Sequence, residues 1–217
     1  VTLTNGSIIT GNICTNSGGG VYVGSNGTLF MNGTSLIGDS ASSTSVAGSS
    51  SYANKAGEGA GIYNAGGRVY IGCDANGSTE NGYAITAGYG IRRNYATSKG
   101  GGYYTTGSGI LKIAGGAISY NQAASSGGGL YIYSNTSAIV DISGGTFEGN
   151  KAVTGGYIYN GGTLTMTGGT VGGSSSTYQN TATSNGGAVY QNGTFNLSGS
   201  ANLYFSGNTA GTNDVYQ

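Results

Sequence analysis

The chain has 217 residues, of which 47 are glycine and none is proline, tryptophan or histidine; 6% are charged, and the formal net charge is zero. Because each interior glycine costs a helix roughly 1 kcal/mol relative to alanine, this composition argues against a helical protein, and 18 tyrosines with balanced charge argue against a disordered one. No basic patch for nucleic acid is expected, and no apolar run approaches the roughly 20 residues that span a bilayer. We therefore expect an all-β protein that has no nucleic-acid partner and no transmembrane segment.

The first kind of predicted strand is a glycine-rich step followed by an apolar residue and a tyrosine. It begins with GGGVYV (18–23) and recurs at 59–64, 101–105, 127–132, 155–160, 186–191 and 214–217. Because successive side chains of a strand point to opposite faces, we predict that the tyrosines form one exposed aromatic stripe. Its members are Tyr22, Tyr63, Tyr104, Tyr131, Tyr159, Tyr190 and Tyr216, spaced by 41, 41, 27, 28, 31 and 26 residues.

A second short alternating segment follows in each unit. It occurs at 28–32, 68–72, 110–114, 139–143, 163–167 and 194–198. Alternation predicts that Val140 and Ile142 face the interior and that the residue between them faces outward. Lys112 and Asp141 occupy this outward position on adjacent coils, so we expect them to form an exposed ion pair, which contributes only about 0–1 kcal/mol.

The third segment contains one asparagine, usually with a small residue two positions later. An asparagine in a turn tolerates left-handed backbone, and amides stacked on successive coils can bond to one another. We therefore predict a structural asparagine ladder. Its members are Asn12, Asn54, Asn94, Asn121, Asn150, Asn180 and Asn208.

Three short strands that repeat together predict one coil of a solenoid. The predicted fold is an all-β, right-handed, three-sided parallel β-helix with about seven coils of 26–41 residues, forming a single domain over residues 1–217. The two longest coils are expected to place loop insertions near 38–52 and 73–90. Neither end shows a recognisable cap.

Short motifs in these repeats also resemble a known family. FEGN (147–150) and FSGN (205–208) match an FxxN element, and GGAV (186–189) and GGAI (115–118) match a GGAI element. These elements resemble the repeats of the polymorphic outer membrane proteins of chlamydiae, and the same pattern is found in adhesin-like surface proteins. The resemblance implies a β-helix and a secreted or cell-surface location.

Catalytic residues are sparse. Without histidine, no Ser–His or Cys–His arrangement can form, and Cys14 and Cys73 are expected to be unpaired thiols because they occupy different positions of the repeat. Among the acids, Asp141 and Glu148 are close in sequence but fall on different strands, while Asp74 and Glu80 share a loop. We expect no cofactor, no metal and no enzymatic activity; the alternative is a polysaccharide-active β-helix enzyme.

The two ends of the chain suggest self-association. The chain starts in phase with the second strand at Val1, Thr2 and Leu3, and it stops in the first strand of a coil at Val215, Tyr216 and Gln217. Open strand edges favour the addition of further strands. We expect an extracellular structural or adhesive protein whose copies join head to tail into a surface fibre. The alternative is an excerpt of a longer adhesin that binds a host protein or glycan.

Overall fold

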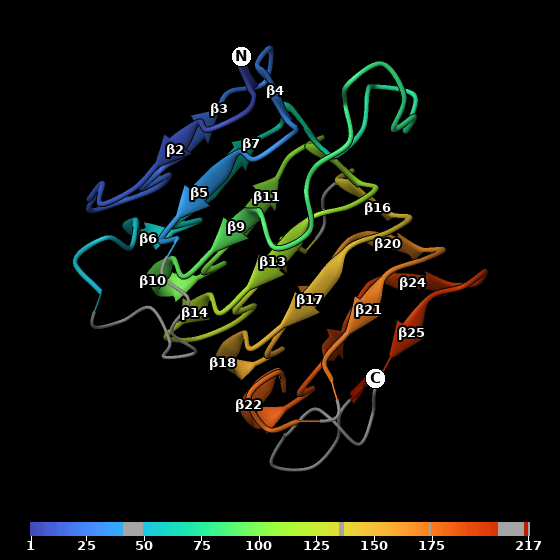
Figure 1. The fold of residues 1–217 in the computed structure, drawn as a ribbon. Helices are drawn as coiled ribbons and strands as arrows, with labels where there is room; N and C mark the ends of the chain where they lie inside the picture. Colours follow the sequence, from blue (N-terminus) through green and yellow to red (C-terminus); the bar gives the residue numbers. More distant parts are fainter. Residues whose placement is uncertain (41–49, 135–136, 174, 204–214, 217) are drawn as a thin grey trace.

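The chain winds into a parallel β-helix. The computed structural model describes residues 1–40, 50–134, 137–173, 175–203 and 215–216. Over these residues every element is a β-strand and every strand pairing is parallel. Figure 1 shows the coils stacked in sequence order, from the blue N-terminal strands to the red C-terminal strands. The described residues form no helix that could cross a membrane.

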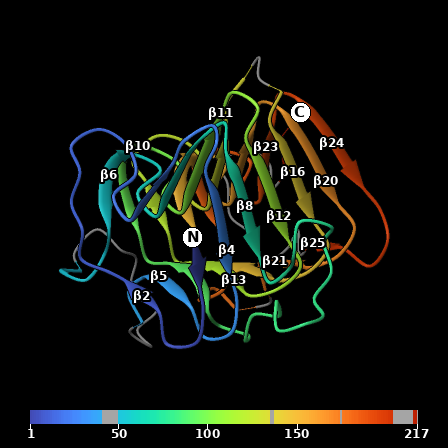
Figure 2. The same ribbon diagram turned by 90° about the horizontal axis from the view of Figure 1, so that it is seen from above.

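Four sheets run along the axis of the solenoid, and we name them A to D in the order in which each coil visits them. Sheet A contains β1 (Thr2–Leu3), β4 (Thr28–Met31), β8 (Arg68–Ile71), β12 (Ile110–Ile113), β16 (Ile139–Ile142), β20 (Thr163–Met166) and β24 (Thr194–Leu197). Figure 2 shows most of these strands side by side. Sheet B contains β2 (Ile8–Ile9), β5 (Leu36–Gly38), β9 (Gly90–Arg92), β13 (Ala117–Ser119), β17 (Thr146–Glu148), β21 (Thr170–Val171) and β25 (Asn202–Leu203).

The other two sheets complete each coil. Sheet C contains β6 (Lys55–Glu58), β10 (Tyr95–Lys99), β14 (Gln122–Ala123), β18 (Lys151–Thr154) and β22 (Thr181–Asn185). Sheet D contains β3 (Val21–Val23), β7 (Ile62–Ala65), β11 (Tyr103–Thr106), β15 (Leu130–Ile132), β19 (Ile158–Asn160), β23 (Val189–Gln191) and β26 (Val215–Tyr216). In the described part of the chain, sheets A, B and D have seven strands each, in agreement with the seven predicted coils.

The predicted three-sided coil was wrong in one respect, because each full coil has four strands. The asparagine segment divides into a strand of sheet B and a strand of sheet C. Between β13 and β14, Tyr120 adopts a φ of 57° and Asn121 follows it. A left-handed residue turns the chain direction within one step, so the asparagine marks a corner rather than the middle of a strand.

The glycine step lies at the corner between sheets C and D. There Gly155 has a φ of 65°, in the left-handed region that glycine adopts without a steric penalty. One coil below, a Cβ on Gly128 would lie 2.4 Å from the carbonyl oxygen of Gly156. The repeated glycines therefore allow the backbones of adjacent coils to approach closely.

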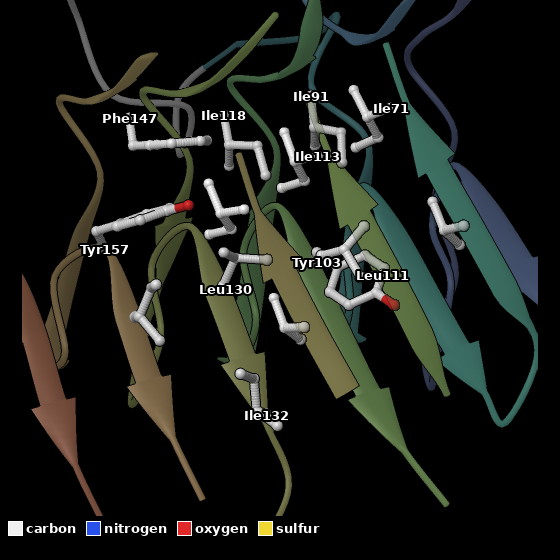
Figure 3. Packing of buried hydrophobic residues seen from close by; sticks show 14 of the residues in the cluster. Ile71, Ile91, Tyr103, Leu111, Ile113, Ile118, Leu130, Ile132, Phe147 and Tyr157 are labelled. Atoms are coloured by element: carbon white, nitrogen blue, oxygen red, sulfur yellow. The ribbon is translucent and has the colours of Figure 1, made fainter. Parts of the chain in front are cut away.

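The core fills the inside of the solenoid. Val140 and Ile142 face inward as predicted, with 0% and 1% of their surface exposed. Inside the later coils, the rings of Phe147 and Tyr157 stack with centroids 4.8 Å apart (Figure 3). Tyr157 occupies the position that Gly129 has in the preceding coil and Ala188 in the following coil, and a Cβ on Gly129 would lie 2.5 Å from the Tyr157 ring. A smaller cluster of buried alanines lies behind sheet C: Ala56, Ala60, Ala96, Ala123 and Ala152.

The two insertions leave the solenoid at different corners. The segment 39–54 joins β5 of sheet B to β6 of sheet C, and the segment 72–89 joins β8 of sheet A to β9 of sheet B. Figure 1 shows the second of these, in green, projecting from the body of the solenoid. Both insertions therefore border sheet B.

Candidate functional site

The asparagine column is a continuous hydrogen-bonded ladder along the corner between sheets B and C. Each Nδ2 donates to the Oδ1 of the asparagine one coil further along, at 2.9–3.1 Å. The column runs through Asn12, Asn54, Asn94, Asn121, Asn150 and Asn180. Its seventh predicted member, Asn208, lies outside the described residues.

Each inner amide of the ladder is satisfied on all sides. The Nδ2 of Asn121 also donates to the carbonyl of Ile91 at 3.0 Å, and the backbone N–H of Asn121 donates to Oδ1 of Asn150 at 3.1 Å. Oδ1 of Asn121 in turn accepts from the side chain and the backbone of Asn94, both at 3.0 Å. Because Asn121 is fully buried, these bonds compensate a desolvation that would otherwise be costly.

The tyrosine column forms a second ladder, on the outer face of sheet D. Six tyrosines stack ring on ring, with centroids 4.7–5.3 Å apart and interplanar angles of 8–14°. The rings are held in line by the strand register, which pairs each tyrosine with the next. They are Tyr22, Tyr63, Tyr104, Tyr131, Tyr159 and Tyr190. β26 continues the register, with Tyr216 paired to Tyr190.

The prediction that this column is exposed was wrong at its centre. Tyr22 is 59% exposed, but Tyr104 and Tyr131 are only 3% and 5% exposed. Both faces of the Tyr104 ring are covered by its stacked neighbours, Tyr133 packs against it at 6.4 Å, and Nζ of Lys99 lies 5.1 Å from the centre of the Tyr131 ring. The tyrosines lie on the outer face of sheet D, but at the centre of the column neighbouring side chains bury them.

Burial changes the acidity of these phenols. Desolvation, with a smaller contribution from Glu58, raises the pKa of Tyr63 and of Tyr104 above the usual value for a tyrosine. Desolvation also raises the pKa of Tyr131 to about 12. Tyr63, Tyr104 and Tyr131 are therefore neutral over the physiological range, and the centre of the column carries no phenolate charge.

A column of stacked rings offers few free ring faces to a partner. Sugars and flat ligands stack on the face of an aromatic ring, and each inner tyrosine has both faces occupied. Among the described residues Tyr22 has one stacked neighbour, Tyr63, so its other face is open toward the N-terminal end of the solenoid. The aromatic surface available for stacking is thus concentrated at an end of the column.

The predicted self-association residues lie on the outermost strands. Thr2 and Leu3 form β1, at the edge of sheet A, and Val1 binds through its amino group to the carbonyl of Thr28 at 2.8 Å. Val215 and Tyr216 form β26, at the opposite edge of sheet D. Gln217 lies outside the described residues. The structure therefore places the two sets at opposite ends of the solenoid and in different sheets.

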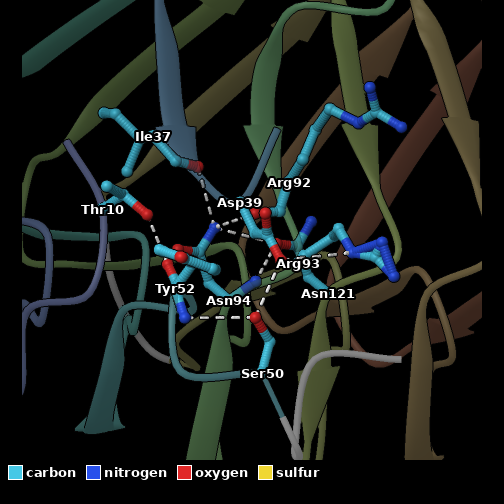
Figure 4. A network of polar contacts seen from close by, with 9 residues as sticks. All are labelled: Thr10, Ile37, Asp39, Ser50, Tyr52, Arg92, Arg93, Asn94 and Asn121. Carbon is cyan, nitrogen blue, oxygen red and sulfur yellow. Dashed lines mark hydrogen bonds and ion pairs between the residues drawn. The ribbon is translucent and has the colours of Figure 1, made fainter. Parts of the chain in front are cut away.

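Near the first insertion, a polar cluster includes an ion pair that the sequence did not predict. Nε of the buried Arg93 lies 4.0 Å from Oδ2 of the buried Asp39, and Ser50 donates to the same oxygen at 2.7 Å (Figure 4). Burial lowers the pKa of Arg93, and Asp39 opposes that shift. Asp39 and Ser50 lie on either side of the segment 41–49, so the cluster fastens the base of this insertion to the corner of the solenoid.

The acidic residues do not come together. Asp74 caps its own turn by accepting from the N–H groups of Asn76 and Ser78, both at 2.8 Å. Lys112 and Asp141 are register partners as predicted, but Nζ of Lys112 donates to the carbonyl of Ala75 at 2.9 Å, and no ion pair joins Lys112 to Asp141 in the described part of the chain. The second insertion thus supplies a carbonyl oxygen that binds Lys112 in place of the Asp141 carboxylate on the neighbouring coil.

No described group of three or more histidine, cysteine or acidic residues could hold a metal ion. Both thiols are free, with Cys73 buried and Cys14 partly exposed, and burial raises the pKa of Cys73.

Sequence reasoning missed a second set of buried asparagines, at the turn from sheet D to sheet A. Oδ1 of Asn64 accepts from Gly67 N–H at 2.7 Å, and its Nδ2 donates to the hydroxyl of Tyr103 at 2.8 Å. Asn160 closes the equivalent turn, accepting from Gly162 N–H at 3.1 Å. The sequence did contain a pattern that marks these asparagines. Each directly follows a tyrosine of the column and precedes two glycines, after one alanine for Asn64 and at once for Asn160.

Comparison with known proteins found no matching family model, no matching curated protein and no matching solved structure.

Proposed function

We propose that this chain is a non-enzymatic structural and adhesive β-helix, secreted or displayed at the cell surface, whose copies associate end to end. The observation that supports this most strongly is the direction of the asparagine ladder. The hydrogen bonds between asparagine side chains that join Asn12 to Asn180 along the described ladder all run from Nδ2 of one coil to Oδ1 of the next coil. The two ends of the ladder therefore differ chemically.

At the N-terminal end, the ladder presents an unused acceptor. Oδ1 of Asn12 accepts no hydrogen bond from the described residues, whereas Oδ1 of Asn94 and of inner members accepts from the coil before. A coil that presents an Asn Nδ2 and a backbone N–H would complete this site. A second copy docked through its own N-terminal end would instead bring two acceptors together, so the ladder favours head-to-tail contact.

The unpaired strand edges and the open end of the core also favour head-to-tail contact. β1, β2 and β3 each have one strand neighbour, and they surround an apolar cavity of about 300 Å³ lined by Val1, Leu3, Ile9 and Val21. At the other end, β24, β25 and β26 are the outer strands of the same three sheets. Stacking would therefore set β1 on β24, β2 on β25 and β3 on β26, and Tyr22 would extend the ring column of the neighbouring copy.

This arrangement refines the expectation drawn from the ends of the sequence. β1 belongs to sheet A and β26 to sheet D, so the two strands would not face each other across the contact. Residues 215–217 and 1–12 would instead belong to successive strands around the axis. The contact would cover the unpaired edge strands and the apolar cavity at the N-terminal end at the same time. A chain with no net charge could therefore form a fibre through strand pairing and apolar burial.

The experiment compares assembly of the wild-type chain with that of Leu3→Lys over a range of concentrations, using sedimentation and electron microscopy. A lysine on an edge strand opposes further strand pairing, so Leu3→Lys is expected to remain monomeric. Thr165→Lys, on the outer face of sheet A, is the matched control and should assemble like the wild type. Deletion of residues 214–217 should also prevent assembly.

A chemical variant tests the same contact without changing the fold. Cys14 lies beside the alanine cluster at the N-terminal end and is partly exposed, whereas Cys73 is buried. A bulky maleimide on Cys14 should block assembly. A wild-type chain that stays monomeric at high concentration, or labelled protein that assembles normally, would refute end-to-end association.

A further inference from the structure

The tyrosine column holds the phenol rings of adjacent coils in stacked pairs. The rings of Tyr22 and Tyr63 are 5.3 Å apart at 12°, and those of Tyr159 and Tyr190 are 5.0 Å apart at 14°. Each pair joins adjacent coils through strand partners. The two rings of each pair are therefore nearly parallel and close enough to stack.

We propose that this column is a site of oxidative modification in which neighbouring tyrosines are coupled to dityrosine. The oxidant is hydrogen peroxide acting through a haem peroxidase. It removes one electron and one proton from each of two phenols, and the two phenoxyl radicals form one carbon–carbon bond between ring carbons ortho to oxygen. The two ortho hydrogens move to the oxygens as the rings regain aromaticity, and the peroxide is reduced to two waters.

Exposure selects the pairs that react. Tyr22 is 59% exposed, and Tyr63, Tyr159 and Tyr190 are partly exposed, so an oxidant can reach these four rings. Tyr104 and Tyr131 are buried beneath their neighbours. The products are therefore a Tyr22–Tyr63 link and a Tyr159–Tyr190 link, with the central rings largely unmodified.

Such links would replace a stabilising element that the chain lacks. Its two cysteines are both free. A covalent bond between adjacent coils closes a loop of the chain and restricts the unfolded state, as a disulfide does. The inference is independent of end-to-end association, because both pairs lie within one chain.

The test treats dilute monomeric protein with peroxidase and hydrogen peroxide, isolates the monomer, and maps dityrosine by fluorescence and by mass spectrometry of proteolytic peptides. The Tyr22–Tyr63 and Tyr159–Tyr190 links are expected, together with an upward shift of Tm. Three tyrosines outside the column serve as internal controls because they are exposed but unstacked and should form no intramolecular link: Tyr52, Tyr89 and Tyr178 at 64%, 36% and 43% exposure.

A conservative variant separates stacking from chemistry. Tyr63→Phe keeps a ring in the column but removes the phenol, so the Tyr22–Tyr63 link should disappear and the Tyr159–Tyr190 link should remain. Tyr52→Phe should leave both. Cross-links that involve the exposed controls as often as the column, or oxidation of the column without any coupling, would overturn the proposal.

Discussion

At the scale of single residues, two amino acids set the geometry of every coil. Asparagine occupies the corner between sheets B and C because its short amide bonds both to the coil before it and to the coil after it. Glycine predominates at the corner between sheets C and D because the first residue of the step has a positive φ and because a Cβ on most of the following glycines would meet the backbone of the next coil. These positions leave little room for substitution, and each permits a direct test.

Asn121→Ala should lower the free energy of unfolding by roughly 2–4 kcal/mol, because it removes the acceptor of the buried backbone N–H and Nδ2 of Asn94 and one of the two donors to Oδ1 of Asn150. Urea denaturation measures the change. The control is Asn196→Ala, an exposed asparagine on the outer face of sheet A, which should change stability by less than about 0.5 kcal/mol. Equal effects of the two substitutions would contradict a structural role for the ladder.

Gly128→Ala should be destabilising by roughly 1–3 kcal/mol, because the added Cβ would meet the backbone of Gly156 and Lys151. Gly24→Ala is the matched substitution, since a Cβ at Gly24 would have no atom within 4 Å. This second variant should be neutral or slightly stabilising, as removing a glycine reduces the entropy of the unfolded chain. Thermal unfolding followed by circular dichroism distinguishes the two outcomes.

At the scale of elements, each strand is only two to five residues long, so its stability depends on its neighbours in the stack. Sheet D shows this most clearly, because its outer face is covered by tyrosine rings from adjacent strands. The column thus has the same effect as a second layer of structure over the sheet, and its central members are as well buried as core residues.

Tyr104→Ala should lower the free energy of unfolding by roughly 3–5 kcal/mol, the usual cost of removing a buried aromatic side chain, since the ring fills the gap between Tyr63 and Tyr131. The near-ultraviolet circular dichroism of the stacked rings should fall as well. Tyr52→Ala, which removes a 64% exposed ring outside the column, should have little effect on either signal. A small loss in Tyr104→Ala would show that the stack contributes little.

At the scale of the whole molecule, a solenoid is held together by contacts between successive coils rather than by one central core. Local perturbations are therefore expected to act through the two neighbouring coils. The exception is a change of conditions that affects many coils together, and titration of the buried tyrosines is such a change.

Stability should fall above pH 10. Burial raises the pKa of Tyr131 and Tyr120 from 10.0 to about 12, so the folded state holds protons that the unfolded state releases. Their stabilising contribution is complete below pH 10 and is lost as the pH rises toward 12, at about 1.4 kcal/mol per pH unit for each group. Urea denaturation at a series of pH values from about pH 9 to about pH 11 measures how the free energy of unfolding falls with pH. Tyr131→Phe removes one titrating phenol, so it should reduce this slope by the contribution of one group.

Much of the architecture followed from the sequence, because its determinants are local. The period of two within strands placed Val140 and Ile142 inside, and the repeat spacing identified seven coils and the asparagine column. These patterns depend only on backbone geometry and on residues at fixed separation along the chain. An all-β solenoid is the arrangement that satisfies all of them together.

Other features depended on what adjacent coils and insertions place nearby, which the tertiary structure alone decided. The left-handed turn at Tyr120 divided one predicted strand into two, and Lys99 and Tyr133 helped to bury tyrosines that alternation directed outward. Likewise, Lys112 bonds to Ala75 rather than pairing with Asp141. The sequence by itself determined which face each side chain takes, whereas only the folded molecule determined whether that face is open to solvent.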